Sequence, residues 1–229
     1  MRKLILNITL AVATLFGMAS CGIDNYDEPE STIEGNITYN GQALQLPGTG
    51  GVIRLNAYQD GYALHSPFYI YVDQNGHFSA KVFNGTYKII PADNVGPWTN
   101  TTDTLTVTVK GSTTADIKVT PYFLVSDFNC TLNGKQVAIS FKVEKIINSA
   151  TIDHATVCVG NTAIIDDHNN AASFDIPGAY IKVGANSFSQ TLSDEQVKAI
   201  SAMKKVNVRL GLRASGASQS IFSQILSLK

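Results

Sequence analysis

The chain has 229 residues and a formal net charge of −1 at pH 7, and only 15% of its residues are charged. This balance leaves no basic footprint, so nucleic acid is excluded as an expected partner. The low charge and the many Thr, Val, Ile, Tyr and Gly residues favour β-structure over helix. The length suits one large or two small domains.

The N-terminus has the order of a bacterial secretory signal. A cationic head, Met1-Arg2-Lys3, precedes an apolar run over residues 4–18 and then Ala19-Ser20-Cys21. Spanning a bilayer takes roughly 20 apolar residues, more than this run offers. The small residues before Cys21 resemble a lipobox, although Met18 stands where that motif usually has Leu. We therefore expect residues 1–20 to be a signal peptide and Cys21 to carry lipid, palmitate included; the alternative is an ordinary signal peptide with Cys21 incidental.

The stretch after Cys21 is acidic and lacks apolar periodicity, so we expect residues 21–31 to be a lipidated cysteine and a solvated tether. Acidic residues in this place are similar to the export signal of Bacteroidota surface lipoproteins. That resemblance implies an outer-membrane protein, lipid-anchored and facing the cell exterior. Loss of Arg2 and Lys3 from the 17 basic residues leaves 15 against 18 acidic ones, a net charge of −3.

Residues 32–121 alternate apolar and polar side chains in short runs that end in turn signals. The expected strands are 33–39, 52–58, 68–72, 78–82, 87–90, 105–109 and 117–119. Asn40-Gly41 and Asn84-Gly85 are turn dipeptides between such runs, and residues 105–109 have one apolar and one hydroxyl face. Short strands joined by Asn-Gly-type turns predict an antiparallel sandwich or barrel.

A family resemblance rests on Gly76-His77-Phe78 and Asn84-Gly85-Thr86-Tyr87. The pair resembles the signature of transthyretin-like and CnaB-like sandwich domains, in which the glycines permit tight turns and the aromatics fill the core. With Cys21, the acidic tether and a domain closing at Thr120-Pro121-Tyr122, the chain resembles a Bacteroidota lipoprotein family of unknown function. Relatives of that kind accompany SusC/SusD-type nutrient importers, which implies that transporter proteins are partners.

A second domain is expected over residues 122–229, because Pro121 cannot serve a central strand and new strand patterns begin beyond it. Its expected strands are 123–132, 137–143, 155–159, 181–183, 206–213 and 221–228. Ser193-Asp194-Glu195-Gln196 is a capping box that predicts a helix over 193–204. The pattern resembles a fibronectin-III or immunoglobulin-like sandwich with one short helix. The predicted fold is thus all-β, with two consecutive antiparallel β-sandwich domains.

Cys130 and Cys158 fall in strand patterns of the second domain, in an oxidising compartment. A disulfide between them would stabilise the fold by about 2–4 kcal/mol. The alternative is two buried thiols that pack as small apolar residues. No Cys-x-x-Cys motif supports a redox or zinc role.

The sequence contains no motif for catalysis. The four histidines lack metal-ligand spacing, and there is no Gly-x-Ser-x-Gly. Asp166-Asp167-His168-Asn169-Asn170 could offer oxygen ligands to calcium, but a polar hairpin loop explains it equally. We read Asp73-Gln74-Asn75-Gly76 as a β-turn and Gly48-Thr49-Gly50-Gly51 as a flexible loop. We expect no metal, no cofactor and no enzyme, with a hydrolase as the residual alternative.

Carbohydrate binding is the more serious functional alternative. Trp98, Tyr69 and Tyr71 could stack on sugar rings, because alternating strand residues cannot all face inward. Trp98 could instead cap the open end of the first sandwich, and the two tyrosines could pack on a neighbouring strand or domain. Asp103-Thr104-Leu105 matches a Bacteroidota O-glycosylation acceptor at Thr104.

These observations predict a surface-exposed lipoprotein that acts as a non-enzymatic accessory subunit of a SusC/SusD-type glycan or peptide uptake system. The alternative is a surface glycan-binding protein that uses aromatic side chains as its contact surface.

Overall fold

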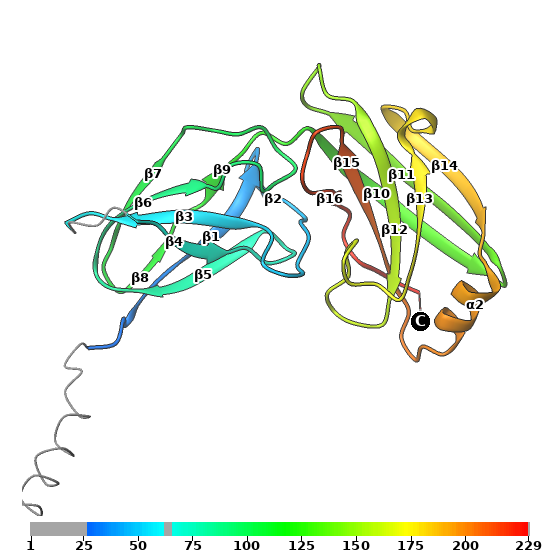
Figure 1. The fold of residues 1–229 in the computed structure, drawn as a ribbon, viewed down its shortest axis with the longest axis horizontal. Coiled ribbons are helices and arrows are strands. Elements are labelled where there is room, and N and C mark those ends of the chain that lie inside the picture. The colour runs from blue at the N-terminus through cyan, green and yellow to red at the C-terminus, as the bar shows by residue number, and fades with distance from the viewer. Residues whose placement is uncertain (1–26, 62–65, 229) are drawn as a thin grey trace, which may run out of the picture.

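The computed structural model describes residues 27–61 and 66–228, so the predicted signal peptide and Cys21 lie outside the described residues. The chain folds into two β domains that lie side by side along the long axis, β1–β9 in one and β10–β17 in the other (Figure 1). The described chain begins at the end of the first domain remote from the second. Within the described ranges, no helix is long and apolar enough to cross a membrane.

The first domain packs two sheets against each other. One sheet has β1 between β5 and the short strands β8 and β9, with β2 continuing the β1 hairpin, and the other has the order β4-β3-β6-β7. β8 and β9 pair with β1 in parallel, which departs from a purely antiparallel sheet. The strands are β1 Ser31–Tyr39, β2 Gln42–Ala43, β3 Arg54–Gln59, β4 Phe68–Tyr71, β5 His77–Val82, β6 Gly85–Pro91, β7 Leu105–Val109, β8 Ser112–Thr114 and β9 Ile117–Lys118.

The aromatics of the family signature fill the first core, as expected. Phe78 and Tyr87 are buried, and the Tyr87 hydroxyl donates to the backbone oxygen of Phe83 at 2.8 Å. Gly76 has a φ of +77°, and a Cβ there would lie 2.5 Å from the Leu44 carbonyl oxygen, so only glycine fits this turn. The turn chemistry and the aromatic core therefore arise from the same few residues.

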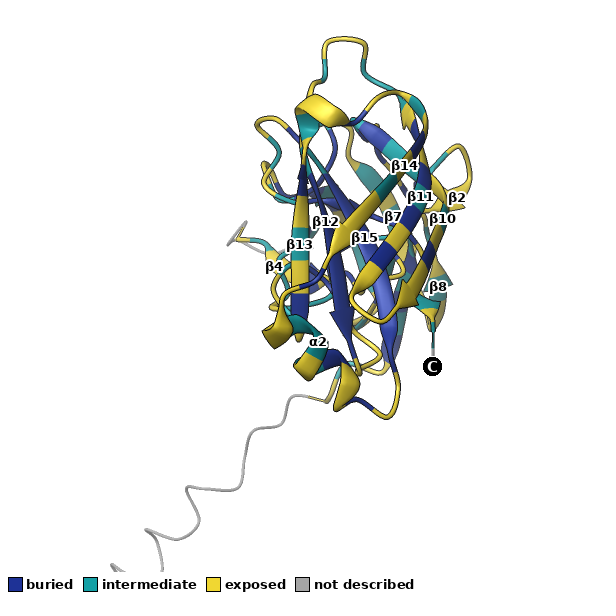
Figure 2. Ribbon diagram, turned by 90° about the vertical axis from the view of Figure 1, so that its right-hand side faces the viewer, coloured by how far each residue is buried: buried dark blue, intermediate teal, exposed yellow. Residues whose placement is uncertain are grey.

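The second domain packs sheet β10-β11-β14 on sheet β13-β12-β15-β16, and β17 also pairs with β15. Figure 2 shows buried residues along β12 and β15 and mostly exposed ones along β14. The elements are β10 Phe123–Asn133, β11 Gln136–Lys145, β12 Ile152–Gly160, β13 Ala172–Pro177, η2 Gly178–Tyr180, β14 Gly184–Thr191, α2 Asp194–Ser201, β15 Asn207–Ala214, β16 Ile221–Phe222 and β17 Leu226–Ser227.

The predicted class of two consecutive β-sandwich domains with one short helix is confirmed. The capping box is present: the Ser193 side chain accepts from the Gln196 N–H, and the Gln196 side chain accepts from the Ser193 N–H. The strand predicted over residues 181–183 is wrong: these residues lie between β13 and β14 and belong to neither. Residues 221–228 form two short strands, not one.

Cys130 and Cys158 are both free and buried, so the structure has the two buried thiols of the second alternative and not the disulfide. Cys130 belongs to the core between the sheets. Val157 and Val159 also face that core, so alternation along β12 directs Cys158 to the opposite side of its sheet. Burial raises the pKa of Cys130 to about 11, and burial together with nearby carboxylates raises the pKa of Cys158 further. Both thiols stay protonated and pack as small apolar groups.

Candidate functional site

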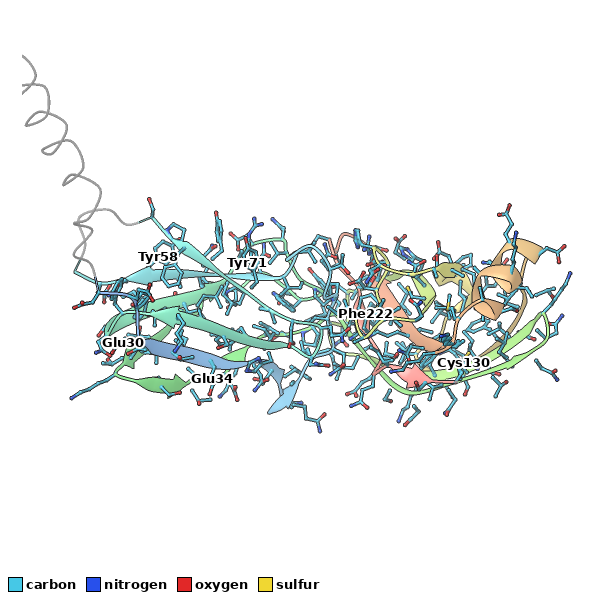
Figure 3. The ribbon with its side chains drawn as sticks, turned by 90° about the horizontal axis from the view of Figure 1, so that it is seen from below. Glu30, Glu34, Tyr58, Tyr71, Cys130 and Phe222 are labelled. Atoms are coloured by element: carbon cyan, nitrogen blue, oxygen red, sulfur yellow. The ribbon has the colours of Figure 1, made fainter. Side chains whose placement is uncertain are left out.

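The outer face of sheet β4-β3-β6-β7 gathers aromatic and polar side chains. Register places Arg54 opposite Tyr71 and Asn56 opposite Tyr69, so all four side chains point to the same side of the sheet. We call these four residues the tyrosine face. Tyr69 is 51% and Tyr71 57% exposed. Figure 3 shows Tyr71 and Tyr58 on one side of the first domain and Glu34 on the other.

Neighbouring groups orient the two rings. The guanidinium of Arg54 lies 5.1 Å from the centre of the Tyr69 ring, a cation–π contact. Tyr71 lies against Gly51, where a Cβ would come within 2.8 Å of the ring. Successive outward residues of a strand are roughly 6.4–6.8 Å apart, so the two tyrosines lie next to each other on the same face. Exposed rings flanked by amide and guanidinium donors suit a ligand with both apolar faces and hydroxyl groups.

Trp98 does not belong to this face. It is only 4% exposed and packs into the core, and it forms a β-bridge with Pro121 at the junction of the domains. A Cβ on Gly96 would lie 2.2 Å from its ring. Of the two alternatives for Trp98, the structure supports the one in which its ring covers the end of the first sandwich, and not the one in which it stacks on sugar. Thr104 is exposed in the loop before β7, and its glycosylation stays a prediction.

A second feature joins the domains through Arg209 of β15, which is fully buried. Its guanidinium donates to the backbone oxygens of Leu46 at 2.9 Å and Gln74 at 3.0 Å in the first domain. It also donates to those of Ser223 at 2.8 Å and Ile165 at 3.2 Å in its own domain. Burial lowers the pKa of Arg209 to about 10, so the group stays charged at neutral pH.

Asp166, in the loop between β12 and β13, completes this contact from the second domain. One carboxylate oxygen accepts the backbone N–H groups of Gly48 at 2.9 Å and Thr49 at 2.8 Å. The other accepts those of His168 at 3.0 Å and Asn169 at 2.9 Å. The glycine-rich loop predicted to be flexible is thus held at its start by the other domain. We call Arg209 and Asp166, with the backbone groups that they bind, the interdomain lock.

The hydrogen bonds of Asp166 also decide its chemistry. Burial by itself would raise the pKa of this carboxyl, but the hydrogen bonds that it accepts, above all from Thr49, outweigh burial and lower its pKa. Asp166, Asp167 and His168 lie close enough to hold a metal ion. However, both oxygens of Asp166 already accept N–H donors, and Asp167 binds Arg213 at 2.8 Å and His168 at 2.9 Å. The side chains of Asp166 and Asp167 already bind other groups of the protein, so the arrangement does not favour a bound cation.

The sequence does not predict the interdomain lock, because the segments that form it look like separate local motifs. Asp73-Gln74-Asn75-Gly76 is the predicted β-turn, since the Asp73 carboxylate accepts from the Asn75 and His77 N–H groups. Nothing in that turn motif indicates that Gln74 faces the other domain. The Gln74 side chain donates to the Ala163 oxygen at 2.6 Å.

Comparison with known proteins gives two domain matches. Residues 31–120 match the N-terminal domain of a protein of unknown function (DUF3823), and residues 123–227 match the domain of unknown function DUF3823_C. No curated protein matches the chain.

Crystal structures of similar proteins have the same two-domain arrangement. A DUF3823 family protein from Parabacteroides merdae is 36% identical with a TM-score of 0.83, covering 89% of this chain and 100% of that one. A DUF3823 family protein from Bacteroides ovatus is 26% identical with a TM-score of 0.75, covering 86% and 97%. A Bacteroides uniformis protein described as a "putative carbohydrate binding protein" is 17% identical with a TM-score of 0.69, covering 88% and 99%.

Proposed function

Since the chain belongs to the DUF3823 family, through both its N-terminal and its C-terminal domain, we propose that it is a non-enzymatic carbohydrate-binding protein of the cell surface. The tyrosine face is its contact surface for glycan. The observation that carries this proposal is the pair of rings at Tyr69 and Tyr71, more than half exposed on the outer face of their sheet. The description of the Bacteroides uniformis relative supports the same class of ligand.

The chemistry of the face fits a polysaccharide. Sugar rings present C–H groups on their faces and hydroxyls at their edges, so a tyrosine can cover the face while Asn56 and Arg54 reach the edge. Lys88 of β6 pairs with Asp60 at 3.2 Å, so the charge of Lys88 is balanced.

The double variant Tyr69→Ala/Tyr71→Ala tests the proposal. We expect a loss of at least tenfold in affinity, about 1.4 kcal/mol, because both stacking surfaces disappear. The measurement is electrophoretic retardation in native gels that contain soluble neutral polysaccharides, compared with gels without them.

Tyr180→Ala is the matched control, because Tyr180 is 73% exposed but belongs to the second domain. It should leave retardation unchanged. Equal retardation of the wild type and the Tyr69→Ala/Tyr71→Ala variant would contradict the tyrosine face as the glycan site.

We also propose that the protein is anchored in the outer membrane through lipid on Cys21 and acts as an accessory subunit of a SusC/SusD-type importer. The family resemblance of the sequence supports this role. The described chain begins at the end of the first domain remote from the second, so a tether there would hold both domains outward from the membrane (Figure 1).

Two measurements test the anchor and the partner. A Cys21→Ala variant should leave the membrane fraction and become soluble, since stable anchoring takes two acyl chains or more. The wild type should co-purify stoichiometrically with the importer in mild detergent, and protease treatment of intact cells should remove it. A Cys21→Ala protein that stays in the membrane, or a wild type fully protected from protease, would overturn this part of the proposal.

A further inference from the structure

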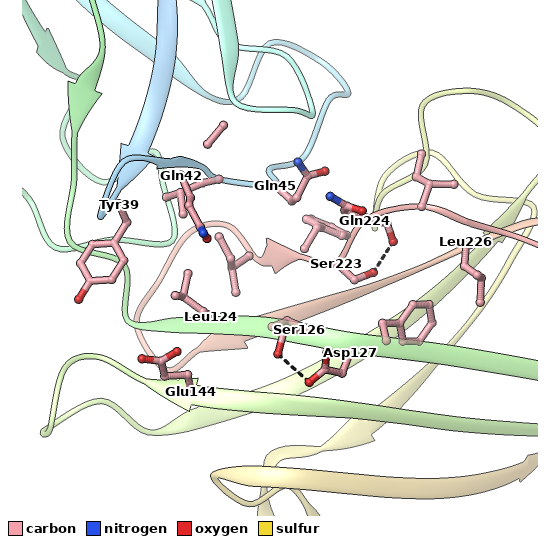
Figure 4. A pocket seen from close by; sticks show the side chains of 17 residues that line it. Tyr39, Gln42, Gln45, Leu124, Ser126, Asp127, Glu144, Ser223, Gln224 and Leu226 are labelled. Atoms are coloured by element: carbon pink, nitrogen blue, oxygen red, sulfur yellow. Dashed lines mark hydrogen bonds between the residues drawn. The ribbon is translucent and has the colours of Figure 1, made fainter.

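A groove of about 540 Å³ runs between the two domains, on β10 and the segment 221–226 (Figure 4). Its volume lies within the roughly 300–1,000 Å³ typical of small-molecule sites. The first domain closes it with Tyr39 and the segment 42–45. The second domain contributes the segment 124–128, Glu144 and the segment 221–226.

A β-bulge shapes the wall that β10 presents to this groove. The register of β10 against β11 shifts between Ser126 and Asn129, and Asp127 there has a φ of +53°. Asp and Asn adopt this left-handed conformation more readily than other non-glycine residues, so Asp127 suits the bulge. All of residues 124–128 line the groove, and the bulge leaves Asp127 and Phe128 among them without register partners on β11.

The bulge also decides between two uses of the groove. β10 is the edge of its sheet among the described strands, so an extended peptide could in principle add to it. A bulge in the middle of an edge strand disrupts that pairing and twists the edge away. The groove therefore suits a compact ligand that binds side chains better than it suits an added strand.

The charges of the groove define the ligand further. Asp127 and Glu144 are its only ionisable groups apart from Tyr39, and none of the described lining residues is basic. Carboxylates accept charge-assisted hydrogen bonds from hydroxyls and repel anions. Gln42 and Gln224 add amide groups that both donate and accept, and Figure 4 shows both beside the groove.

We propose that this groove is a second carbohydrate site, which binds an uncharged mono- or disaccharide unit through Asp127, Glu144, Gln42 and Gln224. The inference rests on the proposed ligand class but on a site distinct from the tyrosine face. A groove closed by two domains suits a short unit or a chain end, whereas the open tyrosine face suits the middle of a chain.

The interdomain lock makes the groove a preformed site. The Phe222 N–H donates to the Gln45 backbone oxygen at 2.9 Å, which ties the segment 221–226 to the segment 42–45. Arg209 lies 4.6 Å from the Phe222 ring and also binds Leu46. Both walls are thus held at a set separation before a ligand arrives, and a rigid site saves the entropy of ordering it.

The test is titration calorimetry of the full mature protein with neutral di- and trisaccharides of glucose, galactose, mannose and N-acetylglucosamine, and with a trisaccharide of galacturonic acid. We expect saturable binding of at least one neutral sugar and none of the anionic one. Asp127→Asn and Glu144→Gln should each weaken binding at least tenfold. Asn tolerates the positive φ of residue 127, so the first variant keeps the bulge.

The controls separate this site from the tyrosine face. Glu195→Gln, on the exposed surface of α2, should leave binding unchanged. Tyr69→Ala/Tyr71→Ala should keep the affinity for short sugars and lose that for polysaccharide. Failure of every neutral sugar to bind, or binding unaffected by Asp127→Asn and Glu144→Gln, overturns the groove proposal. Polysaccharide binding that persists in the tyrosine variant and is lost in the groove variants overturns the tyrosine face instead.

Discussion

Replacing Arg209 with Met is expected to lower the free energy of unfolding by about 3–5 kcal/mol, the usual cost of breaking a buried charged network. At roughly 2–4 °C per kcal/mol for a chain of this size, the unfolding midpoint should fall by about 6–20 °C. The wild type should unfold in one transition, because the lock couples its domains. The variant should show two separate transitions in a calorimetric scan.

A buried ion pair can sometimes be replaced by apolar residues without loss of stability. Whether Arg209→Met lowers or raises the free energy of unfolding therefore depends on the groups that Arg209 binds. Besides the side-chain oxygens of Gln45 and Gln74, which accept at longer distances, the partners are four backbone oxygens that no side-chain substitution removes. They belong to Leu46, Gln74, Ile165 and Ser223. Met fills the volume but donates nothing, and each buried acceptor left unsatisfied costs roughly 1–3 kcal/mol. The loss of acceptor pairing therefore outweighs the gain from not burying a charge.

Arg213→Met is the matched control, because Arg213 lies on the same strand but pairs with Asp167 within the second domain. It breaks one ion pair within the second domain and leaves the contacts between the domains in place, so it should cost less than Arg209→Met and should keep the single transition. A single transition in Arg209→Met with an unchanged midpoint would show that the domains are coupled by something other than the lock.

Arg209 also shows which part of the structure the sequence does not predict. Strict alternation over residues 206–213 predicts strand β15, which forms as expected. Alternation also puts Arg209 and Arg213 on a polar face, which suggests solvent. Only the second domain's packing against Leu46 and Gln74 turns that face into an interior. Periodicity reports the face of a strand, but not what a distant part of the chain later covers.

The sequence also fails to predict strand β14 and leaves the position of Trp98 open, and both have local causes. β14 is polar along most of its length because it is an edge strand with one exposed face, so the apolar alternation that marks a strand is missing. The sequence leaves two places open for Trp98, the surface or the end of the first sandwich, because its neighbours are Gly, Pro, Thr and Asn, which are typical of loops. A loop can still bury a large ring, and loop chemistry alone cannot tell the two cases apart. Tyr69 and Tyr71 were placed on the surface correctly, because strand alternation at β4 directs them outward and Ile70 inward.

Asp166→Asn is expected to destabilise the fold by about 2–4 kcal/mol at pH 7, because hydrogen bonds to a charged group contribute roughly 1.5–3 kcal/mol each. The fully buried carboxylate accepts four backbone N–H groups, two of them from the first domain. An amide offers one oxygen, and its NH₂ group would face N–H donors. The measurement is urea unfolding of both proteins at pH 7, 5 and 3.

The loss of stability in Asp166→Asn should become smaller as the pH falls. The folded protein holds the pKa of Asp166 below its ordinary value, which is about 3.9 in an unfolded chain. The unfolded state therefore binds the proton first as the pH falls, and the carboxylate stabilises the fold fully above about pH 4 and progressively less below it. The gap between wild type and Asp166→Asn should accordingly be constant from pH 7 to 5 and narrow at pH 3. Asp103→Asn, at an exposed position, should show no such gap. A gap that stays constant down to pH 3 would mean that the variant acts through altered packing of the loop and not through the charge that the four N–H groups hold.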